Sequence, residues 1–499
     1  MPFGQRFSES CKGCFLEEAK LISIFLTTIF LITLTQLVFL GSVISLENRD
    51  STKTISWLLI LGVLPVLGAL LYVLFGRVVR KRRLSRHKQV RQDQTEEILI
   101  DRQVRPSAED VDQAGNSPMN KKLARLLLND ADAPLTLNNR SEVLTNGKKT
   151  FRALFSALEN AKNHIHLEYY LFHNDALGRD VLNLLMRKAS EGVKVRVLVN
   201  GLGNRSLEKR FGELRIAGVE TAGFYPVRFP FLSRRLNLRN HRKIVVVDGR
   251  VGFLGGLNVG DEYLSRNKKI GFWRDTFIKI EGDSVNFLQT VFLNDWNGVT
   301  HQSISDPLYY PQPQHFGSQM TQIAATGPDS DWGSMLQIFF VALTSAENSI
   351  FIETPYFIPD EGSFMALKTA ALSGLDVRII LQGVPDHKLT YWASHSYIEE
   401  LLESGVRIYR YTKGILHAKV LILDSEIGVV GSTNFDIRSF SLNFEVSAFI
   451  YDCKFAQRLE QDFYQDLTDS EEIVLEEYKL RPLSNRIKES SARLFSPLL

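Results

Sequence analysis

Cysteine is scarce in this sequence, with three residues in 499: Cys11, Cys14 and Cys453. So few thiols cannot form a disulfide framework, and they are typical of a chain that works in a reducing compartment. Cys11 and Cys14 form a C-x-x-C pair, but no second pair of metal-binding residues lies nearby in the sequence. We therefore expect two thiols without a metal at this position, because a structural zinc site needs four ligands.

Charged residues are missing from two long stretches near the N-terminus, residues 21–46 and 54–76. At about 1.5 Å per residue, a helix of either length would cross a hydrocarbon layer of roughly 30 Å. A buried core helix seldom stays uncharged for so long, and the apolar part of a signal peptide is shorter. The sequence therefore predicts a transmembrane hairpin within residues 1–76, with a kink at Pro65 in its second helix.

Acidic residues are missing from residues 77–91, which contain eight lysines and arginines. By the positive-inside rule, this basic flank places the rest of the chain on the cytoplasmic side of a cell membrane that it crosses more than once. The polar tether of residues 77–120 either sets this topology alone or also binds acidic lipid, since each basic residue near an anionic leaflet contributes ~1 kcal/mol. The whole chain has a net charge of only +3, so a nucleic-acid partner is not expected.

The remaining sequence contains a repeated motif of the form His-x-Lys-x4-Asp. A histidine and a lysine two residues apart share one face of a strand, so we expect both side chains to point the same way. The aspartate belongs to the motif of candidate catalytic residues, but its odd spacing places it on the opposite face, where it would brace the fold. An asparagine follows each histidine at the same distance. The two copies are His241, Lys243, Asp248 and Asn258, and His417, Lys419, Asp424 and Asn434.

The repeat extends beyond the motif. Residues 161–170 match residues 346–356, and each segment has a strand pattern that includes a glutamate, Glu168 or Glu353. An amphipathic helix and a second apolar strand follow in both copies, which predicts an α/β unit used twice with mostly parallel pairing. We expect two α/β halves, residues 121–310 and 311–499, related by a pseudo-two-fold axis. One active site would then form from both His-Lys segments.

The first half has eleven more residues than the second before its histidine, at about residues 224–234. This insertion mixes phenylalanines with arginines. Such a composition suits the bilayer interface, where rings lie at the headgroup level and arginines contact phosphates. A loop packed on its own core is the alternative.

Two His-Lys pairs without an acidic cluster or a Cys/His set of metal spacing favour phosphate-ester chemistry without a metal. The lysines, with Asn258 and Asn434, would stabilise charge on the non-bridging oxygens. One imidazole would attack phosphorus and the other would protonate the leaving alkoxide, giving a phosphohistidine. Asp275 and Glu445 are the candidates to orient the imidazoles. The symmetry of the motif does not assign the two histidine roles.

These motifs resemble those of the phospholipase D superfamily. Together with the apolar N-terminal stretches, they are more closely similar to the bacterial cardiolipin synthases. The resemblance rests on both copies of the motif and on residues 168–170, 353–357 and 431–439. It implies transfer of a phosphatidyl group from one phosphatidylglycerol to another at an anionic phospholipid membrane, giving cardiolipin and glycerol without a cofactor. It also implies His241 as the nucleophile and His417 as the general acid.

Other functions stay open at this point. A membrane-anchored phospholipase D would use the same residues with water as acceptor, giving phosphatidic acid. A nuclease of the same superfamily fits less well, because the catalytic region is not basic. A lipid-binding scaffold without activity would have no use for two intact His-Lys pairs.

Overall fold

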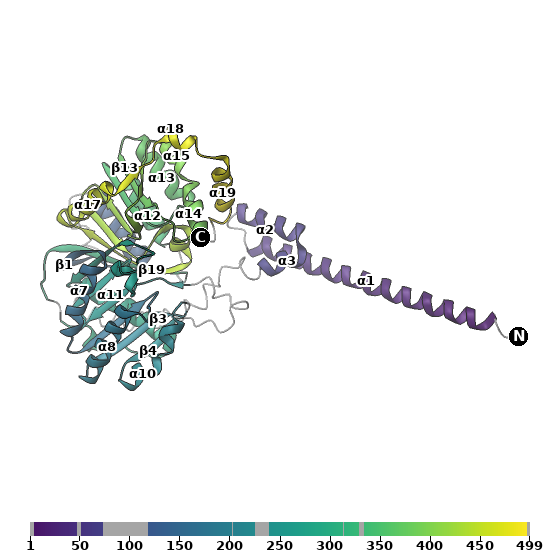
Figure 1. Cartoon of the computed structure of the whole chain (residues 1–499), viewed down its shortest axis with the longest axis horizontal. Coiled ribbons are helices and arrows are strands. Elements are labelled where there is room, and N and C mark those ends of the chain that lie inside the picture. Colours follow the sequence, from purple (N-terminus) through teal and green to yellow (C-terminus); the bar gives the residue numbers. More distant parts are fainter. Residues whose placement is uncertain are drawn as a thin grey trace. The chain divides into compact units, whose positions relative to one another are not determined.

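The computed structural model describes residues 4–46, 51–72, 118–201, 203–224, 239–312, 314–328 and 334–496. These residues belong to two compact units, the N-terminal helices and an α/β body (Figure 1). Most of the basic tether and of the aromatic, arginine-rich insertion lies outside the described residues, so both remain predictions.

The first helix, α1 (Gly4–Leu46), contains the apolar segment Lys20–Gly41, which has a mean hydropathy of 2.2. Among the described helices it alone is long and apolar enough to cross a membrane. Four threonines in this segment donate their hydroxyl hydrogens to carbonyls one turn earlier, so these polar groups are satisfied inside the helix, as a lipid environment demands.

The second predicted span is interrupted. Its described part consists of α2 (Ser51–Val63) and α3 (Pro65–Leu71), which are separated at Pro65 because proline has no N–H to continue the helical hydrogen bonds. The helix after the break turns back, so that the Tyr72 ring lies 5.3 Å from the Trp57 ring. The kink predicted at Pro65 is therefore a break, and the second predicted span is not one continuous helix. The two-span hairpin is not confirmed.

The body contains one 16-stranded sheet whose strand order mirrors itself about the pair β1 and β10. The elements of the first half are α6 (Pro118–Ala131), β1 (Thr136–Thr145), α7 (Asn146–Glu159), β2 (His164–Tyr169), α8 (Ala176–Ser190), β3 (Lys194–Asn200), α9 (Arg205–Glu208), α10 (Phe211–Ile216), β4 (Glu220–Phe224), β5 (Arg239–Asn240), β6 (Ile244–Val247), β7 (Val251–Gly255), β8 (Phe272–Arg274), β9 (Thr276–Glu281) and α11 (Ser284–Thr300).

The second half repeats this order with small additions. Its elements are β10 (Gln319–Thr326), α12 (Ser334–Ser345), β11 (Ser349–Thr354), β12 (Phe357–Ile358), α13 (Glu361–Leu372), β13 (Asp376–Gln382), α14 (Lys388–His395), α15 (Ile398–Glu403), β14 (Arg407–Tyr411), β15 (Gly414–Leu416), β16 (Val420–Leu423), β17 (Ile427–Gly431), β18 (Phe435–Asp436), α16 (Ile437–Ser441), β19 (Asn443–Tyr451), α17 (Cys453–Thr468), β20 (Ser470–Glu472), α18 (Leu475–Lys479) and α19 (Leu483–Arg493).

The duplicated α/β architecture is confirmed, but mostly parallel pairing is wrong. Strands β2, β3 and β4 pair in parallel, as do β11, β13 and β14, because helical crossovers connect them. The middle of the sheet, from β16 through β10 and β1 to β6, is antiparallel. Helices α11 and α17 contribute to one hydrophobic core that contains residues of both halves, so the halves form a single body.

Candidate active site

The two histidines lie just before strands β6 and β16, in short segments outside regular strand structure. The prediction that a strand carries each His-Lys pair is therefore wrong, and the strand begins one residue after the lysine. Each histidine is held by the opposite half through its backbone. The amide of His241 donates to the carbonyl of Phe444 at 2.9 Å, and the amide of His417 donates to the carbonyl of Arg274 at 2.7 Å.

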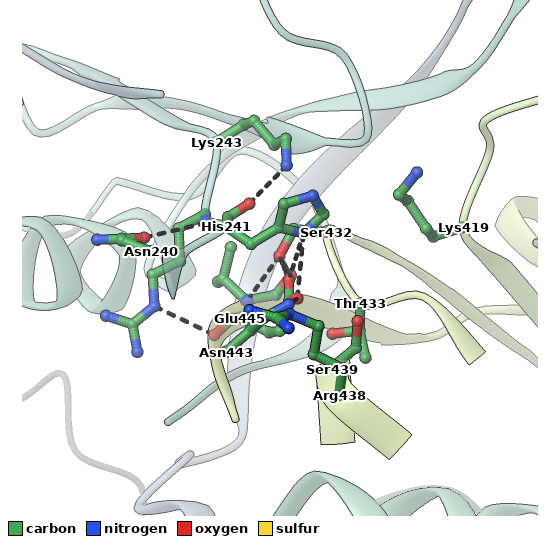
Figure 2. A network of polar contacts seen from close by, with 12 residues as sticks. Asn240, His241, Lys243, Lys419, Ser432, Thr433, Arg438, Ser439, Asn443 and Glu445 are labelled. Atoms are coloured by element: carbon green, nitrogen blue, oxygen red, sulfur yellow. Dashed lines mark hydrogen bonds and ion pairs between the residues drawn. The ribbon is translucent and has the colours of Figure 1, made fainter. Parts of the chain in front are cut away.

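Each imidazole contacts a carboxylate from the other half of the chain. His241 Nδ1 lies 3.0 Å from both carboxylate oxygens of Glu445, and Figure 2 shows these two residues in contact. His417 Nδ1 lies 2.9 Å from Asp275 Oδ2. A carboxylate at Nδ1 favours the tautomer that leaves the Nε2 lone pair free, and it stabilises the imidazolium. These are the two predicted orienting residues, and neither half holds a complete site.

The Glu445 carboxylate is completely buried. Ser432 Oγ donates to one oxygen and Asn443 Nδ2 donates to the other at 3.1 Å (Figure 2). Burial raises the pKa of Glu445 to about 7, although the Lys243 charge and these two donors oppose the rise. The charge beside His241 therefore changes near neutral pH.

Both motif lysines are buried beside the histidines. Lys243 Nζ donates to the carbonyl of its own His241 at 2.6 Å, and Lys419 Nζ lies 2.8 Å from His417 Nδ1. Burial lowers the pKa of Lys419 to about 8 and that of Lys243 well below its usual value, while Glu445 and Asp275 partly offset the burial. The Lys419 charge also lowers the pKa of Lys243. An anion beside both amines would stabilise their charged forms, which suits a phosphate substrate.

The histidines are nearly buried as well. Burial, followed by the nearby lysine charges, lowers the pKa of both His241 and His417. Without substrate, the lowered pKa favours the neutral form of both imidazoles. An imidazole must be neutral to act as a nucleophile, and the arrival of an anionic phosphate would favour protonation of its partner.

The two motif asparagines are not equivalent. Asn258 Oδ1 accepts from the amide of Leu171 at 3.0 Å, and its Nδ2 donates to Tyr263 Oη at 3.2 Å. Asn434 is also buried, but its Oδ1 has no hydrogen-bond partner among the described residues. The fold thus uses both polar atoms of Asn258. Phosphate binding by either asparagine stays a prediction.

The motif aspartates lie at the far ends of strands β6 and β16, and both adopt positive φ. Their carboxylates accept hydrogen bonds of 2.7–2.9 Å from three successive backbone amides. They brace the fold, as their odd spacing predicts, and their place among the candidate catalytic residues stays a prediction. The aspartates and the amides they bind are Asp248 with residues 162–164 and Asp424 with residues 347–349.

Residues outside the His-Lys motif also lie at the site. The Tyr170 ring meets the His241 ring edge-on at 5.0 Å, and Lys243 Nζ lies 5.4 Å from the Tyr170 ring. Arg239 Nη1 donates to Tyr170 Oη at 2.9 Å. The sequence signal available for Tyr170 was its position two residues after Glu168 in the repeated segment. No spacing, however, related Tyr170 to His241.

Comparisons with known proteins identify relatives of this chain. A family profile described as "Cardiolipin synthase, PLD-like domain" matches residues 154–296 and 340–467, and one described as "Phospholipase_D-nuclease N-terminal" matches residues 29–77. The chain is 45% identical to a cardiolipin synthase of Geobacillus kaustophilus (strain HTA426), over 97% of this chain and 95% of that protein. It is 43% identical to the major cardiolipin synthase of Bacillus subtilis (strain 168), over 92% and 96% respectively.

A solved structure supports the fold. The crystal structure of phosphatidylserine synthase from Haemophilus influenzae Rd KW20 matches with a TM-score of 0.59 and 14% identity, covering 76% of this chain and 100% of that one. The matched profile covers both halves of the body, and the relatives align over nearly the whole chain. This chain belongs to the cardiolipin synthase family of phospholipase D-like proteins.

Proposed function

We propose that this protein transfers a phosphatidyl group from one phosphatidylglycerol to another, forming cardiolipin and releasing glycerol. The main support is the convergence of two histidines, each paired with a carboxylate of the opposite half and each beside a buried lysine. Such a site can attack a phosphodiester from one side and protonate the leaving oxygen on the other. The lipid substrate is inferred from the names of the relatives, which are cardiolipin synthases.

The reaction would proceed in two displacements at phosphorus. In the first, Nε2 of one histidine attacks the phosphorus of the donor, and the second histidine donates a proton to the departing glycerol oxygen. In the second, that histidine takes the proton of an acceptor hydroxyl, whose oxygen displaces the first histidine. Family resemblance assigns His241 as nucleophile and His417 as acid and base. Lys243 and Lys419 would stabilise the charge on the non-bridging oxygens.

Helix α1 would anchor the protein in the membrane that holds its substrate, because its apolar segment is long enough to cross. The basic run at residues 77–91 favours a cytoplasmic position for the body. We also propose a second crossing within the apolar residues 54–76. Counting crossings by labelling residues on either side of these segments would test this topology.

Product analysis would test the proposed reaction. The purified full-length protein, given phosphatidylglycerol in mixed micelles with EDTA present, is expected to form cardiolipin and an equal amount of glycerol, both measured by mass spectrometry. Phosphatidic acid as the product would instead make the protein a membrane-anchored phospholipase D. Bound lipid without any product would indicate a scaffold.

The charge on Glu445 predicts a pH dependence. Because its pKa is about 7, the carboxylate is ionised above this pH and loses its charge below it. An ionised Glu445 stabilises the His241 imidazolium and the neutral form does not, so we expect kcat/KM to fall as the pH decreases from 8 to 6. Glu445→Gln should be slow throughout and should lack this decrease.

Asp275→Asn is the matched control for Glu445, because it removes the other orienting carboxylate. It should be slow but should keep the decrease below pH 7. If Glu445→Gln retains the wild-type pH profile, a different group causes the decrease.

A further inference from the structure

The last helix of the body, α19, has an apolar side that faces away from the body. Glu489 and Ala492 of this helix are buried. With about 3.6 residues per turn, the side of the helix opposite these two residues carries three large apolar side chains. We call them the α19 stripe: Leu483, Ile487 and Leu494, which are 70%, 57% and 80% exposed.

Cationic side chains lie on both flanks of the α19 stripe. Arg486, on one flank, forms no ion pair with any of the described residues, and its side chain is exposed. Lys488, on the other flank, is exposed as well, and its Nζ lies 4.9 Å from the Trp392 ring of α14. The one acid within residues 480–496 is Glu489, which is buried and paired with Arg481 at 2.9 Å. The exposed side chains of this segment therefore carry positive charge and no negative charge.

Helix α14 adds to this surface. It packs against α19, and Figure 1 shows the two helices side by side. Its first two residues, Lys388 and Leu389, are both exposed, and Val384 in the preceding loop is 43% exposed. The two helices together thus expose large apolar side chains with lysine and arginine, a composition typical of a surface that binds something.

Helix α14 begins at the edge of the sheet that holds the active site. Glu353 near the end of β11 pairs with Val420 at the start of β16, so β11 ends beside the segment of His417. Tyr356, two residues after β11, donates its hydroxyl hydrogen to Asp386 in the loop that leads into α14. A partner bound to α14 and α19 would therefore lie next to the catalytic edge of the sheet.

We propose that α14 and α19 dock on the surface of an anionic lipid bilayer. The α19 stripe would lie among the lipid headgroups, and Arg486 and Lys488 would contact lipid phosphates on its two flanks. A helix with an apolar stripe between basic side chains suits this position, because it buries apolar area at the acyl boundary and attracts anionic lipid. Docking would hold the catalytic edge against the bilayer.

The charges favour lipid over a second copy of this chain. Two copies joined through their α19 stripes by a two-fold axis would bring the same cations together, and no exposed acid within residues 480–496 would compensate them. An anionic bilayer supplies both an apolar layer and the opposite charge.

Depth-dependent quenching in nanodiscs tests the proposal with the full-length protein. Serine replaces the three native cysteines, and a bimane fluorophore is attached to Leu483→Cys or Leu494→Cys. The discs contain phosphatidylcholine and phosphatidylserine, with or without a lipid that carries a doxyl quencher near the headgroup. At both positions the quencher should reduce fluorescence by about half or more, because an interfacial helix buries its apolar side ~5–10 Å into the headgroup region.

Ile216→Cys is the matched control. Ile216 is an apolar residue that is 91% exposed on α10, and α10 leads into the end of β4 that lies away from the histidines. It should show no quenching. Equal quenching at Ile216→Cys, or none at the two α19 positions, would overturn the proposal. Disulfide cross-linking of two copies through Leu483→Cys without quenching would assign the stripe to a dimer contact instead.

A charge variant tests the preference for anionic lipid. Discs of phosphatidylcholine alone should give weaker quenching at Leu494→Cys than discs with phosphatidylserine. Replacing Arg486 and Lys488 together by glutamine should remove most of this difference, and both positions are exposed, so the fold should be unaffected. Quenching that ignores lipid charge in the parent protein would contradict the proposed role of the cations. The measurement needs no turnover, so its outcome is independent of the proposed reaction.

Discussion

Replacement of either active-site histidine by alanine is expected to abolish cardiolipin formation. Each imidazole would perform one half of a coupled displacement, so neither could replace the other. By analogy with other enzymes whose catalytic groups act as a unit, the turnover of His241→Ala and of His417→Ala should fall by roughly four orders of magnitude or more. Product formation per active protein, measured by mass spectrometry, would give the two rates. His315→Ala, at an exposed position, is the control and should keep wild-type activity.

The same two variants distinguish the nucleophile from the acid. A p-nitrophenyl ester of phosphatidic acid has a leaving group that needs no proton, so a variant without the acid can still be phosphatidylated. We expect a stable adduct on His417→Ala, detected as an increase in intact protein mass, and none on His241→Ala. The opposite result would exchange the two roles. Adducts on both variants, or on neither, would contradict a single phosphohistidine with a separate acid.

The sequence predicted which residues meet at the candidate site better than it predicted which residues support them. Repeated spacing identified His241 and His417, and it indicated a shared site, because each half has one incomplete copy. Spacing could not show that Glu445 supports the first histidine and Asp275 the second. These contacts form between β5 and β19 and between β15 and β8, strands that are distant in the sequence and whose pairing is set by tertiary packing.

The errors of the sequence analysis have physical causes. Hydrophobic runs predict buried strands but not their direction. In the antiparallel middle of the sheet, short turns join only β6 to β7 and β16 to β17, and the other neighbouring strands are separated by longer stretches of sequence. The segment of residues 54–76 is uncharged throughout, so hydropathy alone predicts one span, although Pro65 removes the hydrogen bond that would continue the helix. The link from Arg239 through Tyr170 to His241 was missed, because no repeated spacing relates these three residues.

A buried ion cluster joins the two halves behind His417. Arg274, the residue before Asp275, donates through Nε to Asp466 at 2.6 Å, and its Nη2 lies 3.4 Å from Glu353. It also donates to the carbonyl of Asp275 at 2.7 Å. Both acidic partners belong to the second half, and burial raises the pKa of each. The positive charge of Arg274 therefore stabilises two neighbouring buried carboxylates, and its hydrogen bond to the carbonyl of Asp275 fixes the backbone there.

Arg274→Met is consequently expected to destabilise the body by about 3–5 kcal/mol, the usual effect of removing one partner from a buried ion pair. The methionine fills much of the same volume, but it leaves Glu353 and Asp466 facing each other without a cation. Their pKa values in the folded variant would lie above those of the unfolded chain. Protonation would then relieve the repulsion, so the variant should lose most stability near pH 8 and progressively less towards pH 5.

Urea unfolding of the detergent-solubilised full-length protein, followed by tryptophan fluorescence at both pH values, would measure this difference. Arg140→Met is the matched control, since Arg140 forms an ion pair with Glu281 but its own side chain is 61% exposed. Exposed pairs contribute at most about 1 kcal/mol, so the control should shift the unfolding midpoint only slightly. An Arg274→Met variant as stable as the control at pH 8 would show that the cluster does not hold the halves together. The loss of activity that we also expect, through a displaced Asp275, would then need another cause.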